Sequence, residues 1–193
     1  MTKIVGITGG IGSGKTTLIE FVKSQGFLVY VADEEAKKLL NSEEISNKVQ
    51  FLFSEYVLIK DKILDKKKLA DVIFSNPAHL QKMNALIHPL VQQDFENWVN
   101  NHKGEKILFK ESAILFESGA AKHCDYVILI TAPIDVRIDR VVKRDNTTRE
   151  KVIERMNNQW SDEQKASFSD YIIENIDLTL AKQEIIKVIN MIY

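Results

Sequence analysis

Short apolar runs, separated by glycine-rich or polar stretches, occur at both ends of the chain. Lys3–Thr8 is an apolar, β-branched run that predicts a buried strand, and Phe27–Val31 predicts a second one. Between them, the apolar residues of Thr16–Lys23 recur at helical spacing, and Gly26 marks the expected helix end. A strand, a helix and a strand in this order predict a βαβ unit, and therefore a parallel sheet.

The middle of the chain, from Glu34 to about Lys103, carries little strand signal. Apolar residues recur there at helical spacing, and Pro77 directly after Asn76 is a typical helix start. We therefore expect a helical insertion attached to the sheet domain. Its expected apolar positions are Leu39, Leu40, Ile45, Val49, Leu52, Leu80, Met83, Leu86, Ile87, Leu90, Val91, Phe95 and Trp98.

Strand signals resume after the insertion and alternate again with helical ones. Two helices are expected, over Pro133–Asp145 and Asp177–Ile192. Three further strands are expected, over Lys106–Lys110, Tyr126–Thr131 and Tyr171–Glu174. The alternation extends the parallel sheet that the first βαβ unit predicts.

Charge and cysteine content exclude several classes of partner. The chain has 193 residues and a formal net charge of −1. This balance provides no general attraction for nucleic acid or for an acidic membrane, so we expect neither as a partner. Cys124 is the single cysteine, which excludes an internal disulfide and a zinc site made of cysteines. The sequence shows neither a signal-peptide core nor the ~18 apolar residues of a membrane helix, so we expect a cytoplasmic location.

A glycine-rich motif follows the first predicted strand. Residues 9–16 read Gly-Gly-Ile-Gly-Ser-Gly-Lys-Thr and match the pattern G-x-x-x-x-G-K-[ST] at every fixed position, between a strand and a helix as the motif requires. In such a P-loop, backbone N–H groups surround phosphate, Lys15 reaches the β- and γ-phosphates, and the Thr16 hydroxyl ligates Mg²⁺. The motif therefore predicts a site for ATP and Mg²⁺. The expected nucleotide-binding residues are Gly10, Ile11, Gly12, Ser13, Gly14, Lys15, Thr16 and Thr17.

Two related nucleotide sites are excluded by the same residues. A dinucleotide-binding turn needs a third glycine where Lys15 stands. A GTP switch would need Asp-x-x-Gly and Asn-Lys-x-Asp motifs, and the sequence contains neither. The motif therefore favours a phosphotransferase that acts on a small molecule.

A carboxylate follows the second predicted strand. Ligands of open α/β sheets bind beyond the carboxyl ends of the strands, and Asp33 stands just past such an end. It could orient, or take the proton from, a hydroxyl that attacks the transferred phosphoryl group. The alternative is that Asp33 caps a helix over Glu34–Leu40.

Arginines gather near the third quarter of the chain. Arg137, Arg140 and Arg144 are three and four residues apart, so they share one helical face, and Arg149 and Arg155 follow. Phosphoryl transfer needs positive charge on developing oxyanions, so this segment could form a lid that closes over ATP. The alternative is a solvated basic face, paired with the acidic residues Asp135, Asp139 and Glu154.

Several segments, in order along nearly the whole chain, resemble the dephospho-coenzyme A kinase family. The P-loop alone is generic, whereas the ordered set is specific, and the segments around His88 and Phe116 discriminate best. The matching segments are Ile7–Thr17, Val31-Ala32-Asp33, Leu64-Asp65-Lys66, Leu69, Ile73-Phe74, His88-Pro89, Ala113–Gly119, Arg140, Arg144-Asp145, Arg155, Gln159 and Tyr171–Asn175. The chain departs from the family pattern at Val31 (for Asp), Lys66 (for Arg) and Ala113 (for Pro).

The resemblance implies an α/β fold of the P-loop NTPase type. It implies a five-stranded parallel sheet flanked by helices, a helical substrate-binding insertion and a helical lid. We expect one P-loop kinase domain over 1–193, with its core at about 1–33, 104–139 and 168–193, the insertion at about 34–103 and the lid at about 140–167.

The resemblance also implies the reaction. ATP would phosphorylate the ribose 3′-hydroxyl of dephospho-coenzyme A, giving coenzyme A and ADP in the last step of coenzyme A biosynthesis. The implied catalytic residues are Asp33, Lys15, Arg140 and Arg144, and Arg140 and Asn175 would also bind the nucleotide. The implied acceptor residues are Asp33, Lys66, His88, Leu115 and Arg155.

Two other functions stay open at this point. The chain could be another small-molecule kinase of the same fold, such as a nucleoside monophosphate kinase, because a fold does not determine its acceptor. It could also be a nucleotide-binding regulator that transfers no phosphate, against which the presence of Lys15, Thr16 and Asp33 argues. The sequence leaves the oligomeric state open, and a monomer is the default expectation.

Overall fold

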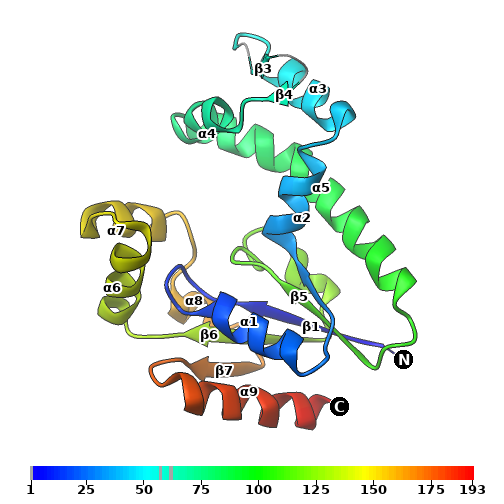
Figure 1. Ribbon diagram of the computed structural model, residues 1–193, viewed down its shortest axis with the longest axis vertical. Coiled ribbons are helices and arrows are strands. Elements are labelled where there is room, and N and C mark those ends of the chain that lie inside the picture. Colours follow the sequence, from blue (N-terminus) through cyan, green and yellow to red (C-terminus); the bar gives the residue numbers. More distant parts are fainter. Residues whose placement is uncertain (1, 57, 61–62) are drawn as a thin grey trace. The chain divides into compact units, whose positions relative to one another are not determined.

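The computed structural model describes residues 2–56, 58–60 and 63–193, and the chain divides into two compact units. Unit 1 comprises Met1–Val31 and Asn101–Tyr193, and unit 2 comprises Ala32–Asn100. Figure 1 shows that unit 1 is built on a sheet and that unit 2 is mainly helical. Within the described residues, no helix combines the length and the apolar character needed to cross a membrane.

Unit 1 contains a five-stranded sheet with the order β2-β5-β1-β6-β7, in which every pairing is parallel. Its strands are β1 (Lys3–Thr8), β2 (Val29–Val31), β5 (Ile107–Glu111), β6 (Tyr126–Thr131) and β7 (Tyr171–Glu174). This confirms the five-stranded parallel sheet that was predicted. Because β1 lies in the centre of the sheet, the loop that follows it leaves from the middle of the sheet edge.

Unit 1 also contains several helices. They are α1 (Lys15–Ser24), α6 (Ile134–Asp145), α7 (Arg149–Met156), α8 (Asp162–Ala166) and α9 (Leu178–Ile192), with a short 3₁₀ turn η1 (Ala120–His123). Figure 1 shows α1 and α9 side by side along the sheet. Their apolar faces pack against the strands in one core, which includes Val5, Ile7, Leu18, Val22, Phe109, Ile128, Ile130, Ile185 and Ile189.

The strand register brings three chain segments to one edge of the sheet. Ile7 of β1 and Val31 of β2 both stand opposite Glu111 of β5. The glycine-rich loop, the segment after Glu111 and the segment after Val31 therefore all begin at the carboxyl edge, where ligands of parallel sheets bind.

Unit 2 has a hydrophobic core of its own. Its elements are α2 (Ala32–Leu39), α3 (Glu43–Leu52), β3 (Ile59–Lys60), β4 (Ile63–Leu64), α4 (Lys66–Phe74) and α5 (Pro77–Asn101). The core includes Ile45, Val49, Phe53, Leu58, Leu64, Leu69, Met83 and Ile87. The short β3–β4 hairpin was not predicted, because two-residue strands are too short to show a period of two.

Helix α2 begins two residues earlier than a capping role for Asp33 requires, because a cap at Asp33 would place the first helical residue at Glu34. Ala32 is its first residue, so Asp33 already lies in the first turn and the N-cap interpretation is wrong. An exposed carboxylate in a first turn still interacts favourably with the positive end of the helix dipole.

Candidate active site

The glycine-rich loop between β1 and α1 adopts a shape that other residues could not. Gly12 and Gly14 have φ angles of 80° and 89°, in the left-handed region that side chains disfavour. A Cβ on Gly12 would lie 2.4 Å from the carbonyl oxygen of Arg137, and one on Gly14 would lie 2.1 Å from Nδ2 of Asn175. Both the conformation and the close neighbours therefore require glycine.

The first turn of α1 carries the polar residues of the motif. Lys15 begins the helix, and its Nζ donates a hydrogen bond to the carbonyl oxygen of Gly9 at 2.7 Å. Thr16 and Thr17 follow on the first turn and are exposed. A helix N-terminus combines free backbone N–H groups with positive partial charge, so this turn suits an anionic ligand.

Three side chains from elsewhere in unit 1 hold the loop backbone. Arg137 Nε donates to the Ile11 carbonyl oxygen at 2.9 Å, and Gln159 Oε1 accepts from the Ile11 N–H at 3.1 Å. Asn175 Nδ2 donates to the Ser13 carbonyl oxygen at 2.8 Å. The nucleotide-binding residue expected at Asn175 therefore contacts the loop itself.

Polar atoms without a partner gather around the same loop. In the described part of the chain, four such buried atoms lie on or against it: Thr8 Oγ1, Ser13 Oγ, Arg140 Nη1 and Asn175 Oδ1. Arg140 is held by its other nitrogen, Nη2, which donates to the Ile176 carbonyl oxygen at 3.3 Å. Buried polar atoms are normally paired, so this arrangement fits a polar ligand seated on the loop.

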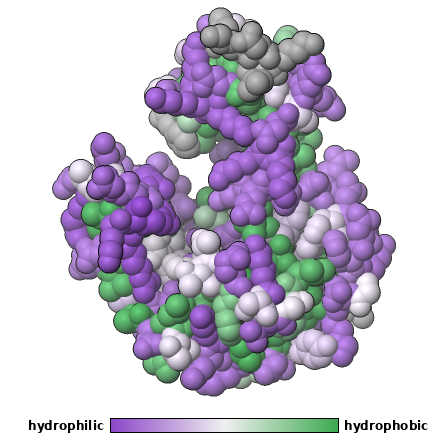
Figure 2. All heavy atoms as spheres, viewed as in Figure 1, coloured by the Kyte–Doolittle hydropathy of each residue, from purple (hydrophilic) through white to green (hydrophobic). Residues whose placement is uncertain are grey.

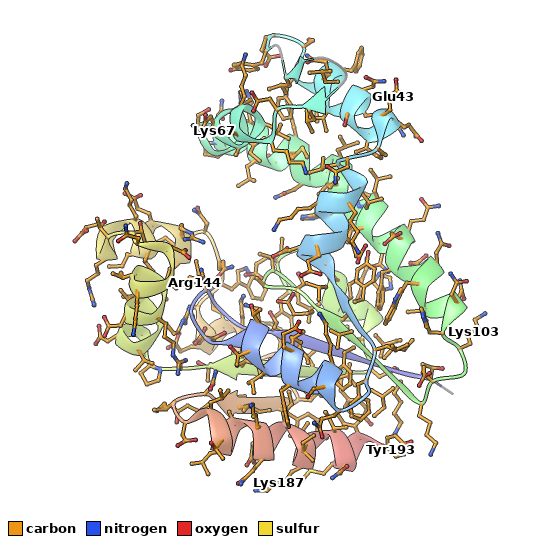
Figure 3. All side chains as sticks on the ribbon, viewed as in Figure 1. Glu43, Lys67, Lys103, Arg144, Lys187 and Tyr193 are labelled. Carbon is orange, nitrogen blue, oxygen red and sulfur yellow. The ribbon has the colours of Figure 1, made fainter. Side chains whose placement is uncertain are left out.

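Helices α6 and α7 with their connection, called here the α6–α7 hairpin, carry the remaining arginines on their surface. Asp145 accepts hydrogen bonds from Arg144 Nε at 2.6 Å and from Arg155 Nη1 at 2.8 Å, while Arg149 pairs with Asp135 at 2.6 Å. The hydrogen bonds from Arg144 and then from Arg155 hold the pKa of Asp145 well below its usual range. Figure 2 shows that this hairpin presents a mainly hydrophilic surface, and Figure 3 labels Arg144 on it.

Two acidic residues, one on β5 and one in the segment after it, were not singled out from the sequence. Glu111 ends β5 beside the loop-bearing strand and is 8% exposed. An acid two residues after the apolar run Ile107–Phe109, at the expected end of a strand, was the signal that could have identified it. Glu117 pairs at 3.1 Å with Lys165, which is completely buried, and it also accepts the Trp160 N–H at 2.9 Å.

Leu115 lies in the core, although an acceptor-binding role was expected for it. Its side chain has no exposed surface, and its Cδ2 lies 2.7 Å from where a Cβ on Gly6 would be. A side chain without accessible surface packs against β1 and does not reach a ligand, so we omit Leu115 from the acceptor site.

Within unit 2, the other expected acceptor residues lie on three different helices. Asp33 is exposed on α2, and Lys66 is exposed at the start of α4, which Asp65 caps. His88 lies within α5, next to Pro89, and burial lowers the pKa of its imidazole. A neutral imidazole can donate one hydrogen bond and accept another.

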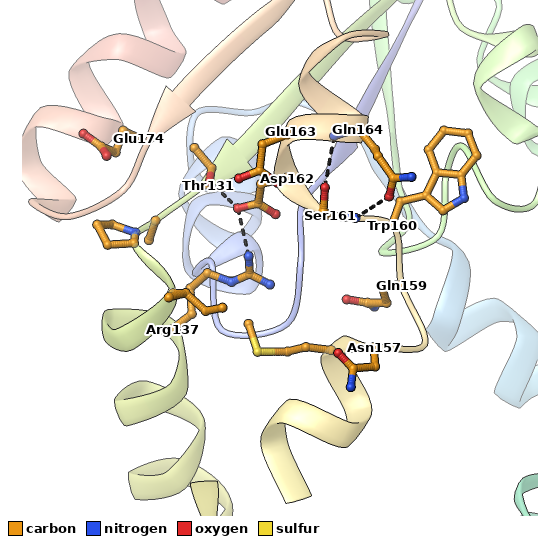
Figure 4. A pocket seen from close by; sticks show the side chains of 14 residues that line it. Thr131, Arg137, Asn157, Gln159, Trp160, Ser161, Asp162, Glu163, Gln164 and Glu174 are labelled. Atoms are coloured by element: carbon orange, nitrogen blue, oxygen red, sulfur yellow. Dashed lines mark hydrogen bonds and ion pairs between the residues drawn. The ribbon is translucent and has the colours of Figure 1, made fainter. Parts of the chain in front are cut away.

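A pocket of about 610 Å³ lies beside the base of α6, among residues of unit 1. Figure 4 shows Arg137, Asp162 and Thr131 joined along one wall, with an Arg137–Asp162 ion pair at 2.8 Å and a hydrogen bond from the Thr131 hydroxyl to the same carboxylate. Gln159 and Trp160 contribute to another part of the lining. In the described part of the chain, no group of three or more His, Cys, Asp or Glu side chains could hold a metal ion.

The fold and this site define a class. A central parallel strand leads through a glycine-rich loop into a helix N-terminus, and an arginine-bearing hairpin adjoins it, as in P-loop kinases. The family model described as "Dephospho-CoA kinase" matches residues 3–180. The chain belongs to the dephospho-CoA kinase family.

Individual relatives agree with this assignment. The chain is 37% identical to a dephospho-CoA kinase of Bacteroides fragilis, over 89% of this chain and 83% of that protein. Among solved structures, TT1252 from Thermus thermophilus superposes with a TM-score of 0.88 at 29% identity, covering 98% of this chain and 97% of that one. A dephospho-CoA kinase from Campylobacter jejuni gives a TM-score of 0.74 at 29% identity, covering 100% and 98%.

Proposed function

We propose that this protein transfers the γ-phosphoryl group of ATP to the ribose 3′-hydroxyl of dephospho-coenzyme A, giving coenzyme A and ADP. Family membership supports the substrate and the reaction. The observation that carries the phosphate chemistry is the complete P-loop on the central strand, with partnerless buried polar atoms around it.

The nucleotide side of the site belongs to unit 1. The N–H groups of the loop and of the first turn of α1 would surround the β- and γ-phosphates, and Lys15 would leave the Gly9 carbonyl to reach them. Arg140 would contribute its partnerless Nη1 to the nucleotide, and Asn175 would keep Ser13 in place while its Oδ1 faces the ligand. The catalytic contribution of these groups is fixed positive potential where negative charge develops.

The residues present fit Mg²⁺, which prefers oxygen ligands and keeps several waters. The exposed Thr16 hydroxyl, at the start of α1, would hold it together with phosphate oxygens. Glu111, at the carboxyl end of β5, adds a carboxylate at the same sheet edge. When bound, the ion would neutralise charge on the transferred phosphoryl group.

Unit 2 would supply the acceptor side. Asp33 would orient the 3′-hydroxyl and accept its proton, since it follows β2 at the carboxyl edge and is exposed. Lys66 and His88 would contact the rest of the acceptor. Lys66 keeps the charge of the family's arginine but lacks its planar fork, so it would bind a phosphate as a point charge.

The α6–α7 hairpin would act as the lid. Arg144 and Arg155 share the carboxylate of Asp145, and exchanging it for phosphate oxygens would bring positive charge to the transferred group. Closure of this hairpin would also exclude water, which competes with the hydroxyl acceptor for the phosphoryl group.

We assign the reaction to the cytoplasm.

Asp33→Asn tests the chemistry, with Glu34→Gln on the same turn of α2 as the matched control. We expect Asp33→Asn to lower kcat with dephospho-coenzyme A by about 10²–10⁴-fold while ATP binding is kept. The control should keep both. Unchanged kcat in Asp33→Asn would refute its role at the hydroxyl, and absence of turnover in the wild type would favour a non-catalytic regulator.

A further inference from the structure

Ile11, at the tip of the glycine-rich loop, is bonded through both of its backbone polar groups to the two ends of the α6–α7 hairpin. Its carbonyl oxygen accepts from Arg137, in the first turn of α6. Its N–H donates to Gln159, which follows the end of α7 and lies 148 residues away in sequence. One peptide segment of the loop is therefore held from two sides by side chains.

The Ile11 side chain makes a third attachment to the same hairpin. It packs against the small apolar core formed by Ile138, Val141 and Val152, which joins α6 to α7. The loop tip is thus part of the hairpin's own packing. Packing and hydrogen bonds thus connect Ile11 to both helices.

Arg137 is itself held firmly, so it can position the loop. Its side chain is buried, and its Nη1 lies 2.8 Å from the carboxylate of Asp162. The same carboxylate accepts a hydrogen bond from the hydroxyl of Thr131 at the end of β6. A Cβ on Gly10 would lie 2.0 Å from Arg137 Nη2, so the second glycine of the motif leaves the space that the guanidinium occupies. Position 10 therefore requires glycine for a reason other than contact with phosphate.

Gln159 lines the pocket beside the base of α6, as Figure 4 shows. A substituted side chain at this position has room beside it, so a variant at 159 tests the hydrogen bond more than the packing. The same pocket is lined by Gln164, whose Oε1 accepts the Ser161 N–H at 2.9 Å in the capping box of α8. Each glutamine accepts one backbone N–H, but the N–H that Gln164 accepts belongs to Ser161 at the start of α8 and not to the glycine-rich loop.

We propose that Arg137 and Gln159 are positioning residues for phosphoryl transfer. They act through the backbone of Ile11 and set the direction of the loop's N–H groups, so that the hairpin and the phosphate-binding loop change shape together. The proposal rests on the proposed function only in that the loop binds the phosphates of ATP.

The test compares Gln159→Leu, Gln159→Glu and the matched control Gln164→Leu. Leucine cannot accept the Ile11 N–H, whereas glutamate can. Losing one hydrogen bond to a backbone N–H should weaken ATP binding about tenfold in Gln159→Leu, measured as Kd by titration calorimetry. Gln159→Glu should stay within about threefold of the wild type. KM for the acceptor should not change in either variant.

The outcomes separate this proposal from the proposed function. A Kd change confined to Gln159→Leu supports it, and equal changes in Gln159→Leu and Gln164→Leu overturn it, because they would indicate general destabilisation. Unchanged ATP affinity in Gln159→Leu also overturns it. The Kd for ATP is measured without turnover. A wild-type protein that is inactive with dephospho-coenzyme A would therefore refute the proposed function, whereas the Kd comparison could still be interpreted.

If Gln159→Leu does not fold, Arg137→Lys provides the second variant. Lysine keeps a positive charge opposite Asp162 but lacks the planar fork that serves Asp162 and Ile11 together. We expect weaker ATP binding at an unchanged acceptor KM. Wild-type affinity in a folded Arg137→Lys protein would overturn the proposal.

Discussion

The base and the tip of the α6–α7 hairpin use the same residue types in opposite ways. At the base, Arg137 is 7% exposed and pairs with Asp162 of helix α8, and in α8 itself Lys165 is completely buried against Glu117. At the tip, defined here by Asp145 at the carboxyl end of α6, the side chains of Arg144 and Arg155 are 59% and 50% exposed and share this carboxylate. Arg137 and Arg144 lie on the same helix, about two turns apart.

This difference distinguishes charged pairs that hold the structure from charged pairs that can exchange partners. Breaking a buried pair leaves an unpaired charge in a low-dielectric environment, so we expect the ion pairs at the base to stay intact. Exposed pairs contribute little to stability, so Arg144 and Arg155 can exchange partners at small cost. Helical spacing alone, which predicts one shared face for these arginines, does not distinguish the two uses.

The largest effect should come from breaking the buried Lys165–Glu117 pair beside the base of the hairpin. Lys165→Met leaves the Glu117 carboxylate without its cation and should lower the free energy of unfolding by about 3–5 kcal/mol. Lys187→Met, which removes an exposed pair with Glu184 at 3.3 Å, should change it by less than about 1 kcal/mol. Urea denaturation measures both. Equal losses would remove the distinction between buried and exposed pairs.

A slightly smaller effect, on chemistry and not on folding, should follow from Lys15→Met. We expect kcat to fall by about 10²–10³-fold, because one fixed positive group is lost from the transferred phosphate. Lys23→Met is the control on the same helix, since Lys23 pairs with Glu20 on the surface. Comparable turnover in the two variants, from assays at saturating ATP, would exclude Lys15 from the reaction.

Gly12→Ala tests how closely the loop fits the base of the hairpin. The new Cβ would require a left-handed backbone and would meet the Arg137 carbonyl oxygen at 2.4 Å. We expect a loss of about 1–3 kcal/mol in unfolding free energy, together with weaker ATP binding. Gly104→Ala is the control, because nothing lies within 4 Å of its Cβ position. A wild-type thermal midpoint for Gly12→Ala would show that the loop tolerates the shift.

The smallest effect should come from Asp145→Asn at the tip. The folded-state pKa of Asp145 is lowered, so its contribution to stability is present above the ordinary carboxyl pKa and is lost as pH falls through the lowered value. The variant should therefore be slightly less stable than the wild type at neutral pH, and the difference should shrink in acid. Thermal unfolding across this pH range measures it, and a difference that grows in acid would contradict the assigned sign.

Local sequence signals predicted those strands and loops whose formation depends on residues close together in the sequence. The strand at Lys3–Thr8, the loop after it and the strand at Tyr126–Thr131 follow from apolar runs and glycine spacing, and the structure has them at these bounds. The hydrogen bond between Ile11 and Gln159 could not be predicted in this way, because 148 residues separate them. No periodicity indicates which side chain will meet a backbone group so far along the chain.

Two expectations also show where residue type misleads. Leu115 lies in a segment that resembles the family's pattern, yet its burial under β1 gives it a packing role. Arg137 was one member of an exposed-looking cluster, yet the small residue at Gly10 leaves room for it beside the loop. In both cases the deciding contact comes from a different strand or loop.

The proposed phosphoryl transfer is tested by measuring ADP release from Mg·ATP by the purified wild-type protein. Dephospho-coenzyme A is compared with AMP, CMP, dTMP and no acceptor. We predict turnover confined to dephospho-coenzyme A. Turnover only with a nucleoside monophosphate would contradict the proposed acceptor, and ATP binding without turnover on any acceptor would contradict the assignment as a kinase.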